Sequence, residues 1–313
     1  MTDPADAISR AESILRAACG DRVRTRFPLA PLTTFRVGGP AALFLEPESE
    51  ADLVAVSEAV RDSGVAVATL GKGSNVLVAD AGFEGLVLRL GRSFRWSARD
   101  GGRLTAGASM PLPALAGVAL THGLTGLEFG VAIPASLGGA VMMNAGAHGG
   151  ELADVLESID AFGLSEGAAR LVPASEAGLS YRRSAFAPNT VVVGATVRLS
   201  PGEPSEIRAR MDEAREWRRR TQPLAEPNCG SVFTNPSGDH AARLIDEAGG
   251  KGRRVGLASV STKHANFIVA AEGATATDVV MLIGEIQDLV AERSGVRLEP
   301  EVRIVGDLDL ATR

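Results

Sequence analysis

The segment that most constrains this chain is a glycine-rich run at residues 126–149 that carries almost no charge. Its glycine content argues against a stable helix, and its lack of charge is not typical of a solvated loop. Because glycine loses the most backbone freedom on folding, such density has two explanations: backbone that directs N–H groups at an anionic ligand, or a tightly packed crossover between layers. Within the run, Ser136 and Asn144 add short polar side chains that can reach a ligand.

Two further glycine elements favour the ligand-binding explanation. Gly-Lys-Gly-Ser-Asn at residues 71–75 lies between apolar segments at 65–70 and 76–79, which predicts a sharp turn between two strands. It has neither the Gly-x-Gly-x-x-Gly spacing nor a Walker loop. A third glycine element lies at residues 33–40. Three such elements before residue 150 indicate one extended ligand with an anionic centre.

Composition limits the class of protein. With 313 residues, two or three domains are expected, and 32 basic against 38 acidic residues, without a large basic cluster, predict no nucleic-acid partner. No apolar stretch reaches membrane-spanning length, so we expect no membrane association. Two cysteines, Cys19 and Cys229, fit a reducing cytoplasm, and four scattered histidines predict no metal site.

Hydrophobic periodicity and end signals predict the secondary structure. The first helix is expected at residues 3–19, and the second follows a Ser49 cap and ends at Gly64. A small mixed sheet is predicted from strands at 36–45, 65–70, 76–79 and 86–90. Further helices are predicted at 111–122, 205–220, 239–248 and 277–293, and further strands at 103–106, 155–162, 191–199, 258–270 and 296–304.

Three segments in the second half carry candidate chemistry. Residues 181–184, Tyr-Arg-Arg-Ser, hold the only tyrosine, but two arginines before a strand are commonly surface residues. Ser231, in Cys-Gly-Ser-Val-Phe-Thr-Asn-Pro at 229–236, is by itself better explained as a turn or cap residue. In the segment 298–306, period-two spacing places Glu299, Glu301 and Arg303 on one face, which alone would suggest a paired surface edge.

Taken together, these motifs resemble the UDP-N-acetylenolpyruvoylglucosamine reductase family. The matching segments are 34–39, 71–75, 130–140, 181–184, 229–236 and 298–306. The resemblance implies an α+β fold: a two-subdomain FAD-binding fold of the vanillyl-alcohol-oxidase (PCMH) type, with a C-terminal α+β substrate domain. We expect FAD-binding subdomains at 1–95 and 96–204 and the substrate domain at 205–313. The chain is similar to the shorter class of the family, which lacks an extra substrate-lid insertion.

The resemblance also implies the reaction and its partners. Non-covalent FAD, with NADPH as hydride donor, would reduce UDP-N-acetylglucosamine enolpyruvate to UDP-N-acetylmuramate in peptidoglycan precursor synthesis. Arg182 would bind the substrate carboxylate, Ser231 would protonate the α-carbon, and Glu301 would help to stabilise the enol intermediate. The protein is expected to be a cytoplasmic monomer.

The resemblance assigns two larger groups of binding residues. For the cofactor these are Arg36, Gly71, Lys72, Gly73, Ser74, Asn75, Val76, Gly130, Ile133, Pro134, Ser136, Gly138, Gly139, Asn144, Ala145 and Gly146. For the substrate they are Tyr181, Asn235, Lys263, His264, Asn266 and Arg303. Many family members carry lysine where this chain has Thr234, so any diphosphate contact of that lysine would pass to Asn235 or another cation.

Two alternatives belong to other classes. An alcohol oxidase of the wider flavin superfamily would share the glycine elements, but would often carry a histidine or cysteine for covalent flavin attachment. A non-catalytic sugar-nucleotide binder would keep the glycine elements without needing Ser231 or Glu301. Neither alternative predicts the Tyr-Arg, Gly-Ser and Pro-Glu motifs in this order.

Overall fold

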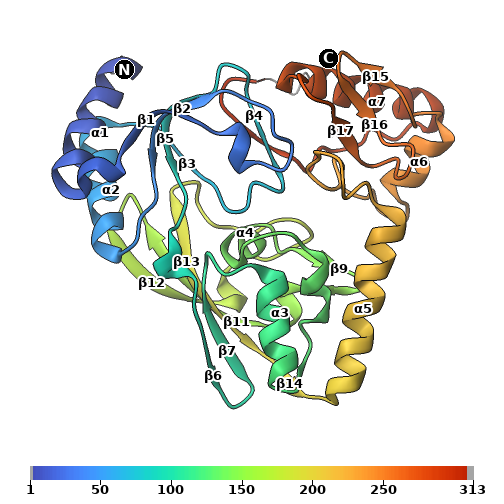
Figure 1. The fold of residues 1–313 in the computed structure, drawn as a ribbon, viewed down its shortest axis with the longest axis horizontal. Coiled ribbons are helices and arrows are strands. Elements are labelled where there is room, and N and C mark those ends of the chain that lie inside the picture. The colour runs from blue at the N-terminus through green and yellow to red at the C-terminus, as the bar shows by residue number, and fades with distance from the viewer. Residues whose placement is uncertain (1–2, 309–313) are drawn as a thin grey trace. The chain divides into compact units, whose positions relative to one another are not determined.

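The computed structural model describes residues 3–308, which divide into two compact units built from interleaved segments of the chain (Figure 1). Unit 1 comprises Met1–Thr25, Leu43–Lys72 and Glu84–Trp217, and unit 2 comprises Arg26–Ala42, Gly73–Phe83 and Arg218–Arg313. Within the described residues, two hydrophobic cores lie in unit 1 and a third in unit 2. The expected division at 1–95, 96–204 and 205–313 stays a prediction.

The first core of unit 1 forms around two helices with strong end signals. Helix α1 (Pro4–Cys19) begins where the Asp3 carboxylate accepts from the Ala5 N–H, and α2 (Glu50–Ser63) is capped by Ser49. Gly64 ends α2 with φ +72°, a conformation that glycine adopts at little cost, as the sequence predicted. The neighbouring sheet has the order β1-β2-β5-β3, with β1 at Arg24–Pro28, β2 at Pro40–Leu45, β5 at Phe83–Leu88 and β3 at Val67–Thr69.

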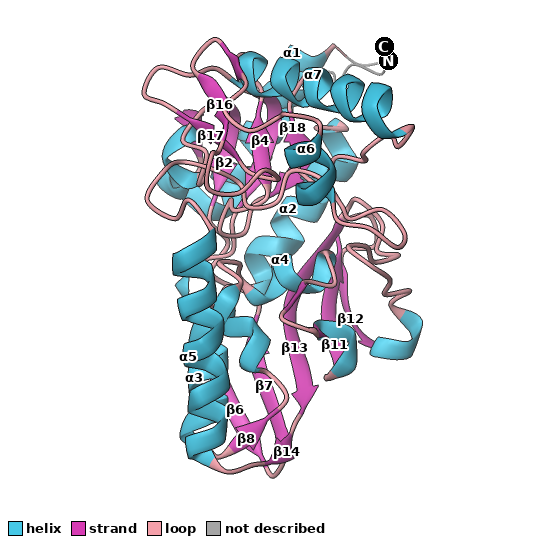
Figure 2. Cartoon of the chain, turned by 90° about the vertical axis from the view of Figure 1, so that its right-hand side faces the viewer, coloured by secondary structure: helices cyan, strands magenta, loops and turns pink. Residues whose placement is uncertain are grey.

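The second core of unit 1 lies on a five-stranded antiparallel sheet of order β12-β11-β13-β7-β6 (Figure 2). Side chains from α3 (Leu112–Thr121) and α5 (Pro204–Thr221) enter this core, as do those of α4 (Leu137–Met142). The strands of this sheet are β6 (Ser97–Asp100), β7 (Arg103–Gly107), β11 (Leu156–Gly163), β12 (Ala168–Pro173) and β13 (Thr190–Arg198). Two short pairs stand apart from it: β8 (Leu124–Thr125) with β14 (Ser200–Pro201), and β9 (Gly146–Ala147) with β10 (Gly150–Glu151).

Unit 2 combines early and late segments of the chain. Strands β15 (Arg254–Val255), β16 (Ala258–Val260) and β17 (Ile268–Ala270) form an antiparallel sheet that packs with α6 (Ala241–Glu247) and α7 (Ala276–Ser294). Strand β4 (Val76–Val78) pairs in parallel with β18 (Arg303–Val305). The buried Leu77 and Val302 bring this pair into the same core as Ile283 of α7.

The predicted strand at 36–45 is correct only from Pro40 onward. Arg36 has φ +59° and Gly38 has φ +106°, values that an extended strand does not allow. The predicted strand at 258–270 is in fact two strands, β16 and β17, joined by a turn in which Ser261 N–H donates to Phe267 O. Backbone conformation in these places is set by local turns that hydrophobicity does not reveal.

Two further predictions were wrong in part. The segment 296–304 is a strand only at its end, in β18, although the alternation is present: Leu298 and Val302 are buried, while Glu299 and Arg303 are exposed. Strand β4 forms where predicted but pairs with β18 instead of with the strands at 67–69 and 83–88. The choice of partner depends on a segment far away in the sequence.

The glycine run also contains a helix that its composition argued against. Ser136 caps α4, because its Oγ accepts from the Gly139 N–H at 3.4 Å. The helix is short and buried on the side of Leu137, Ala140 and Val141. Tertiary packing, which supplies most helical stability in proteins, therefore overrides the low propensity of its glycines.

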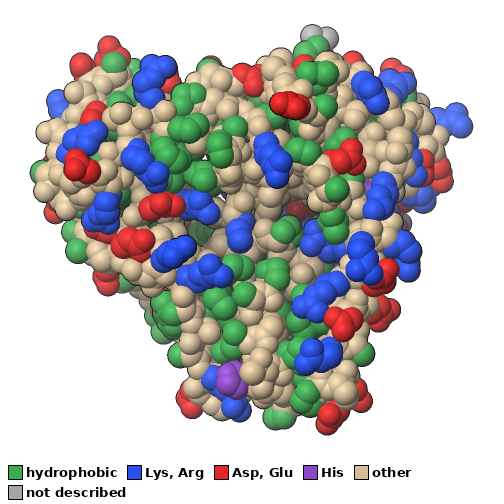
Figure 3. Space-filling model, viewed as in Figure 1, with side chains coloured by type: hydrophobic (Ala, Val, Ile, Leu, Met, Phe, Trp, Pro, Cys, Tyr) green, Lys and Arg blue, Asp and Glu red, His purple; other side chains and the backbone are tan. Residues whose placement is uncertain are grey.

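The surface carries charges of both signs, and Figure 3 shows acidic and basic side chains over the elements of each unit. Between residues 3 and 308, no helix has the length and apolar character needed to cross a membrane. In the same range, no three or more His, Cys, Asp or Glu side chains are grouped so that they could hold a metal ion.

Candidate active site

The turn at residues 71–75 presents unpaired backbone donors. Throughout the described part of the chain, none of its N–H groups donates to another protein atom. Its glycines are held closely: a Cβ on Gly71 would lie 2.5 Å from Ser136 Oγ, and one on Gly73 would lie 2.2 Å from Leu32 O. Consecutive free N–H groups form the kind of concave donor array that binds phosphate, and the exposed Lys72 adds a positive charge.

Asn75, at the end of this turn, is bonded to the segment that carries Glu301. Its Nδ2 donates to Glu301 O at 3.1 Å, and its own carbonyl accepts from Arg303 N–H at 3.1 Å. The adjoining Val76 then pairs with Arg303 in the β4–β18 ladder. The structure therefore joins Asn75, a predicted cofactor-binding residue, to the backbone of a predicted catalytic residue within unit 2.

The segments of Ser231 and Glu301 also lie next to each other. Glu301 N–H donates to Val232 O at 2.7 Å, and Thr234 N–H donates to Glu299 O at 3.0 Å. This short antiparallel contact includes a bridge between Phe233 and Pro300. Two of the three predicted catalytic residues are thus held on neighbouring backbone in unit 2.

Asn266 holds the serine segment from the other side. Its Oδ1 accepts from Phe233 N–H at 2.9 Å and its Nδ2 donates to Phe233 O at 2.8 Å, while its own carbonyl accepts from Val232 N–H. The side chain is buried. Its predicted part in substrate binding stays a prediction, but its amide already satisfies the backbone beside Ser231.

Cys229 is a buried neighbour of the serine. Burial raises the pKa of its thiol, and the negative charge of Glu301 raises it further. The thiol is therefore protonated at neutral pH and is a poor nucleophile. Its location in the core of unit 2 makes it an apolar packing residue.

Three more of the predicted substrate residues lie in unit 2: Lys263 and His264 between β16 and β17, and Asn235 before α6. Lys263 Nζ donates to Arg219 O at 2.7 Å, and His264 Nδ1 accepts from Asn266 N–H at 3.3 Å. Burial lowers the pKa of His264, and Lys251 lowers it further, so its imidazole is neutral at pH 7. Asn235 Oδ1 accepts from Ala241 N–H at the start of α6.

In the glycine run of unit 1, backbone N–H groups are bonded to other parts of the protein. Leu137 N–H and Gly138 N–H donate to Met110 O and Ala108 O. A Cβ on Gly138 would lie 2.9 Å from that of Ala108, and one on Gly130 would lie 3.1 Å from Leu112 Cγ. Close packing thus explains these glycines, whereas the turn at 71–75 has the free N–H groups expected of an anion site.

Arg182, the third predicted catalytic residue, sits on a tight turn in unit 1. It has φ +58°, and its Nη2 donates to Gly146 O at 2.9 Å. The guanidinium also lies over the ring of Tyr181, with 4.9 Å from Cζ to the ring centroid. The glycine run and the Tyr-Arg motif, separate in sequence, therefore meet in space.

The predicted site residues fall into two groups, one in each unit. Unit 1 holds Gly71, Lys72, Gly130, Ile133, Pro134, Ser136, Gly138, Gly139, Asn144, Ala145, Gly146, Tyr181 and Arg182. Unit 2 holds Arg36, Gly73, Ser74, Asn75, Val76, Ser231, Asn235, Lys263, His264, Asn266, Glu301 and Arg303. The convergence of Arg182 with Ser231 and Glu301 stays a prediction.

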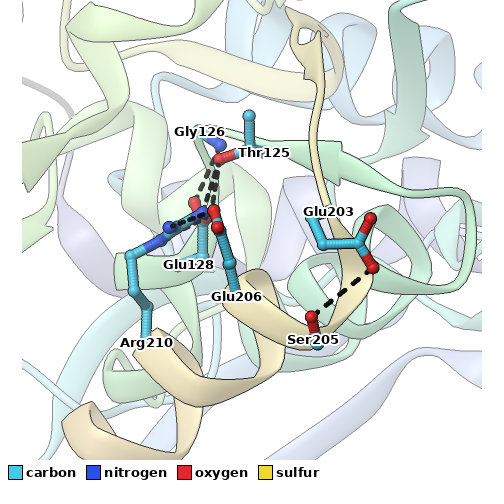
Figure 4. Close-up of polar contacts among 7 residues, drawn as sticks. All are labelled: Thr125, Gly126, Glu128, Glu203, Ser205, Glu206 and Arg210. Atoms are coloured by element: carbon cyan, nitrogen blue, oxygen red, sulfur yellow. Dashed lines mark hydrogen bonds and ion pairs between the residues drawn. The ribbon is translucent and has the colours of Figure 1, made fainter.

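A polar network at the start of the glycine run was not predicted (Figure 4). Arg210 of α5 donates to Glu128 at 2.7 Å, and the other Glu128 oxygen accepts from Gly126 N–H at 2.7 Å. Burial opposes ionisation of Glu128, but hydrogen bonds from Thr125 and Arg210 outweigh it and lower its pKa. The one signal in the sequence was that Glu128 is the only acidic residue in the glycine run 126–149.

Comparison with known proteins identifies the family. Residues 41–167 match the family model described as FAD binding domain, and residues 222–305 match that of UDP-N-acetylenolpyruvoylglucosamine reductase, C-terminal domain. The UDP-N-acetylenolpyruvoylglucosamine reductase of Anaeromyxobacter sp. (strain Fw109-5) is 46% identical over 307 residues, which cover 98% of this chain and 95% of that one. The chain belongs to the UDP-N-acetylenolpyruvoylglucosamine reductase family.

Other relatives in the reductase family agree. The protein of the same name from Myxococcus xanthus is 46% identical, with 92% of this chain and 94% of that one covered. The crystal structure of the Thermus caldophilus reductase has a TM-score of 0.80 and 38% identity, covering 91% of this chain and 99% of that chain. The predicted α+β FAD-binding fold with a C-terminal domain is thereby confirmed.

The residues of this reductase-family chain fit the diphosphate group of FAD. The free N–H groups of residues 71–75 supply donors, and the positive φ of Gly73 and the close contacts of Gly71 leave no space for larger side chains. In a typical dinucleotide fold a long helix would begin here, but in this chain strand β4 follows directly. The free donors of this turn therefore belong to a loop between strands and not to a helix N-terminus.

Proposed function

We propose that this chain is a UDP-N-acetylmuramate dehydrogenase that reduces UDP-N-acetylglucosamine enolpyruvate with NADPH, a step of peptidoglycan precursor synthesis. The observation that carries the proposal is the bond from Glu301 N–H to Val232 O at 2.7 Å, which places the Ser231 and Glu301 segments together. Bound FAD supplies hydride transfer between NADPH and the β-carbon of the enol ether. The protein's own residues bind, orient and protonate the substrate.

Ser231 is the proposed proton donor. Addition of hydride to the β-carbon leaves carbanion character at the α-carbon, which is basic enough to take a proton from a hydroxyl. Serine stays protonated in the resting enzyme at neutral pH, whereas a carboxylic acid would need a raised pKa. The contacts of Val232 and Phe233 with Asn266 and Glu301 fix the backbone on which this hydroxyl is carried.

Arg182 and Glu301 are proposed to stabilise the enol intermediate. A planar guanidinium matches a carboxylate with two parallel hydrogen bonds, and negative charge on the substrate carboxylate grows during reduction. Glu301 would hold a proton or order a water beside this group, with Arg303 nearby. This role requires Arg182 to come within hydrogen-bonding distance of the substrate together with Ser231 and Glu301.

Substrate recognition is assigned to residues around the serine segment. Lys263 is proposed to contact the diphosphate or uridine of the substrate, together with Asn235 and His264. Thr234, where many relatives have lysine, donates through Oγ1 to Glu299 O at 3.3 Å. Its hydroxyl therefore strengthens the backbone contact beside Glu301, and positive charge must come from elsewhere. We further propose a cytoplasmic monomer without a nucleic-acid partner.

The test is an anaerobic two-step absorbance experiment on the purified flavoprotein. NADPH is added in slight deficit, and UDP-N-acetylglucosamine enolpyruvate follows. Bleaching of the flavin band and rapid recovery on addition of the enol ether is expected. Recovery with oxygen alone would contradict the proposal and favour an oxidase, and a colourless protein that cannot bind FAD would favour a sugar-nucleotide binder.

The role of Ser231 is tested in the same experiment. Ser231→Ala should slow re-oxidation by substrate by at least about 100-fold, the lower end of the range for a lost proton donor, while reduction by NADPH is retained. Ser237→Ala, which alters an exposed serine just after this segment, is the matched control. If Ser231→Ala slowed both half-reactions equally, the assigned role would be wrong.

A further inference from the structure

Asn144 is a buried polar residue in the middle of the glycine run. Its side chain has no exposed surface, and its φ of +39° lies in a region where asparagine is one of the tolerated residues. The sequence suggested that its carboxamide would reach the cofactor. In the structure, both ends of the carboxamide have protein partners.

These partners lie on two different segments. Nδ2 donates to Ser180 O at 3.1 Å, and Oδ1 accepts from Ala153 N–H at 2.9 Å. A buried amide bonded at both ends is costly to disturb, because removing one partner leaves the other group without a hydrogen bond. The carboxamide of Asn144 is therefore engaged by protein backbone at both ends, and its own backbone N–H donates to Val141 O at 3.1 Å.

The Ser180 carbonyl belongs to the turn that carries Arg182. Ser180 and Arg183 exchange two backbone hydrogen bonds of 3.0 Å each, and Arg182 lies at the tip of this turn with φ +58°. The next residue, Ser184, donates from Oγ to Met142 O at 2.9 Å. Both ends of the turn are thus fastened to the glycine run by side-chain bonds.

Arg182 itself makes a third contact with the run, from Nη2 to Gly146 O at 2.9 Å. The guanidinium is consequently oriented by residues that flank Asn144. A shift of the turn would move the guanidinium, and an error of about 1 Å in the placement of such a group can cost about 100-fold in rate.

We propose that Asn144 is a positioning residue for Arg182, a role that rests on the proposed reductase function. Its carboxamide holds the turn 180–183 in the position from which the Arg182 guanidinium binds the substrate carboxylate. Asn144 acts through Arg182 and touches neither the substrate nor the reacting atoms. Its effect should therefore appear in substrate-dependent re-oxidation and disappear when Arg182 is absent.

The variant Asn144→Asp tests this directly. Aspartate keeps the acceptor for Ala153 N–H but removes the donor to Ser180 O. We expect re-oxidation of reduced flavin by the enol ether to slow on the order of tenfold, the usual effect of one lost buried hydrogen bond. Flavin reduction by NADPH should stay within about twofold. Asn189→Asp, the same change at an exposed site in unit 1, is the control.

A double-mutant cycle decides whether Asn144 acts through Arg182. In an Arg182→Ala background, Asn144→Asp should cause no further slowing of re-oxidation. Independent, multiplicative effects would overturn the inference, and so would equal slowing of both half-reactions by Asn144→Asp. If Arg182→Ala itself re-oxidised as fast as the unmodified protein, the assigned role of Arg182 in the proposed function would be wrong instead.

A second variant covers the case in which Asn144→Asp does not fold. Ser184→Ala removes the bond to Met142 O at the other end of the same turn and leaves Asn144 intact. It should slow re-oxidation selectively and should likewise have no effect in the Arg182→Ala background. If Ser184→Ala slowed re-oxidation further in the Arg182→Ala background, the bonds that hold the turn would not act through Arg182, and the inference would be wrong.

Discussion

Asn75 donates its side-chain N–H to the backbone carbonyl of Glu301 at 3.1 Å, across 226 residues of sequence. Asn75 ends the turn with the free N–H groups, and Glu301 is the proposed catalytic carboxylate. The bond holds Asn75 against the backbone of Glu301 inside unit 2. A shift of Asn75 would therefore move the backbone of Glu301.

The first prediction concerns this bond. Asn75→Asp removes the donor and places a carboxylate against the Glu301 carbonyl, so we expect the free energy of unfolding to fall by about 1–3 kcal/mol. Chemical denaturation followed by circular dichroism measures the loss. An unchanged denaturation midpoint would show that the turn and the Glu301 segment are held together by other contacts.

The second prediction concerns Gly71. A Cβ there would lie 2.5 Å from Ser136 Oγ, so Gly71→Ala must displace the side chain that caps α4, at a cost of about 1 kcal/mol for a lost cap. We expect a lower FAD content after purification, measured by the ratio of flavin to protein absorbance. In Gly117→Ala the new methyl group meets no atom within 4 Å, so this control in α3 should keep its flavin and gain stability.

The third prediction is a pH dependence of stability in unit 1. Two hydrogen bonds of 2.6 Å from Arg22 lower the pKa of Asp52 to about 2, even though burial acts in the opposite direction. The unfolded chain takes up this proton near pH 4, so the contribution of the pair is complete above that pH and is lost as the pH falls toward 2.

Asp52→Asn should therefore lower the free energy of unfolding at pH 7 by an amount on the order of 2 kcal/mol and flatten its dependence on pH below 4. Denaturant titrations at a series of pH values measure both effects. Asp239→Asn is the contrast, because Asp239 pairs with Arg243 on the surface, where salt screens the interaction. An equal response of the two variants would contradict the larger contribution assigned to the part-buried pair of Asp52 and Arg22.

The fourth prediction concerns the two thiols. Cys19 and Cys229 are both buried, and burial raises the pKa of each. Neither should react with a disulfide reagent such as 5,5′-dithiobis(2-nitrobenzoate) in the native protein, whereas both should react in denaturant. Release of thiolate absorbance from the folded protein would show that one of these cores opens to solvent.

Local signals in the sequence predicted several elements well. The Ser49 cap and the Gly64 terminus bracket α2, because caps and left-handed glycines act within a few residues. The positive φ of Arg36 and the parallel pairing of β4 with β18 were not predicted. The first belongs to a local turn, in which Arg36 N–H donates to Thr33 Oγ1, and the second is a contact with a distant segment. Hydrophobic spacing records neither.

The candidate site, too, was predicted only in part. The motifs identified the segments that meet, but not what their polar side chains do. Asn144 and Asn266 were assigned to ligands, and the structure shows that their amides bond protein backbone. A short polar side chain beside a glycine serves either purpose equally well, so its residue type alone does not reveal the partner.

The parallel ladder of β4 and β18 also affects how the protein is made. Strand β4 is synthesised early, yet its partner at Arg303–Val305 lies near the end of the chain. While the ribosome is still at work, unit 2 cannot close, because Leu77 lacks the late segments that bury it. Its folding must wait until Arg303–Val305 has been synthesised, although unit 1 has all of its residues once Trp217 has been made. A stop codon just before Arg303 would therefore leave unit 2, which begins at Arg26, without the strand that pairs with β4.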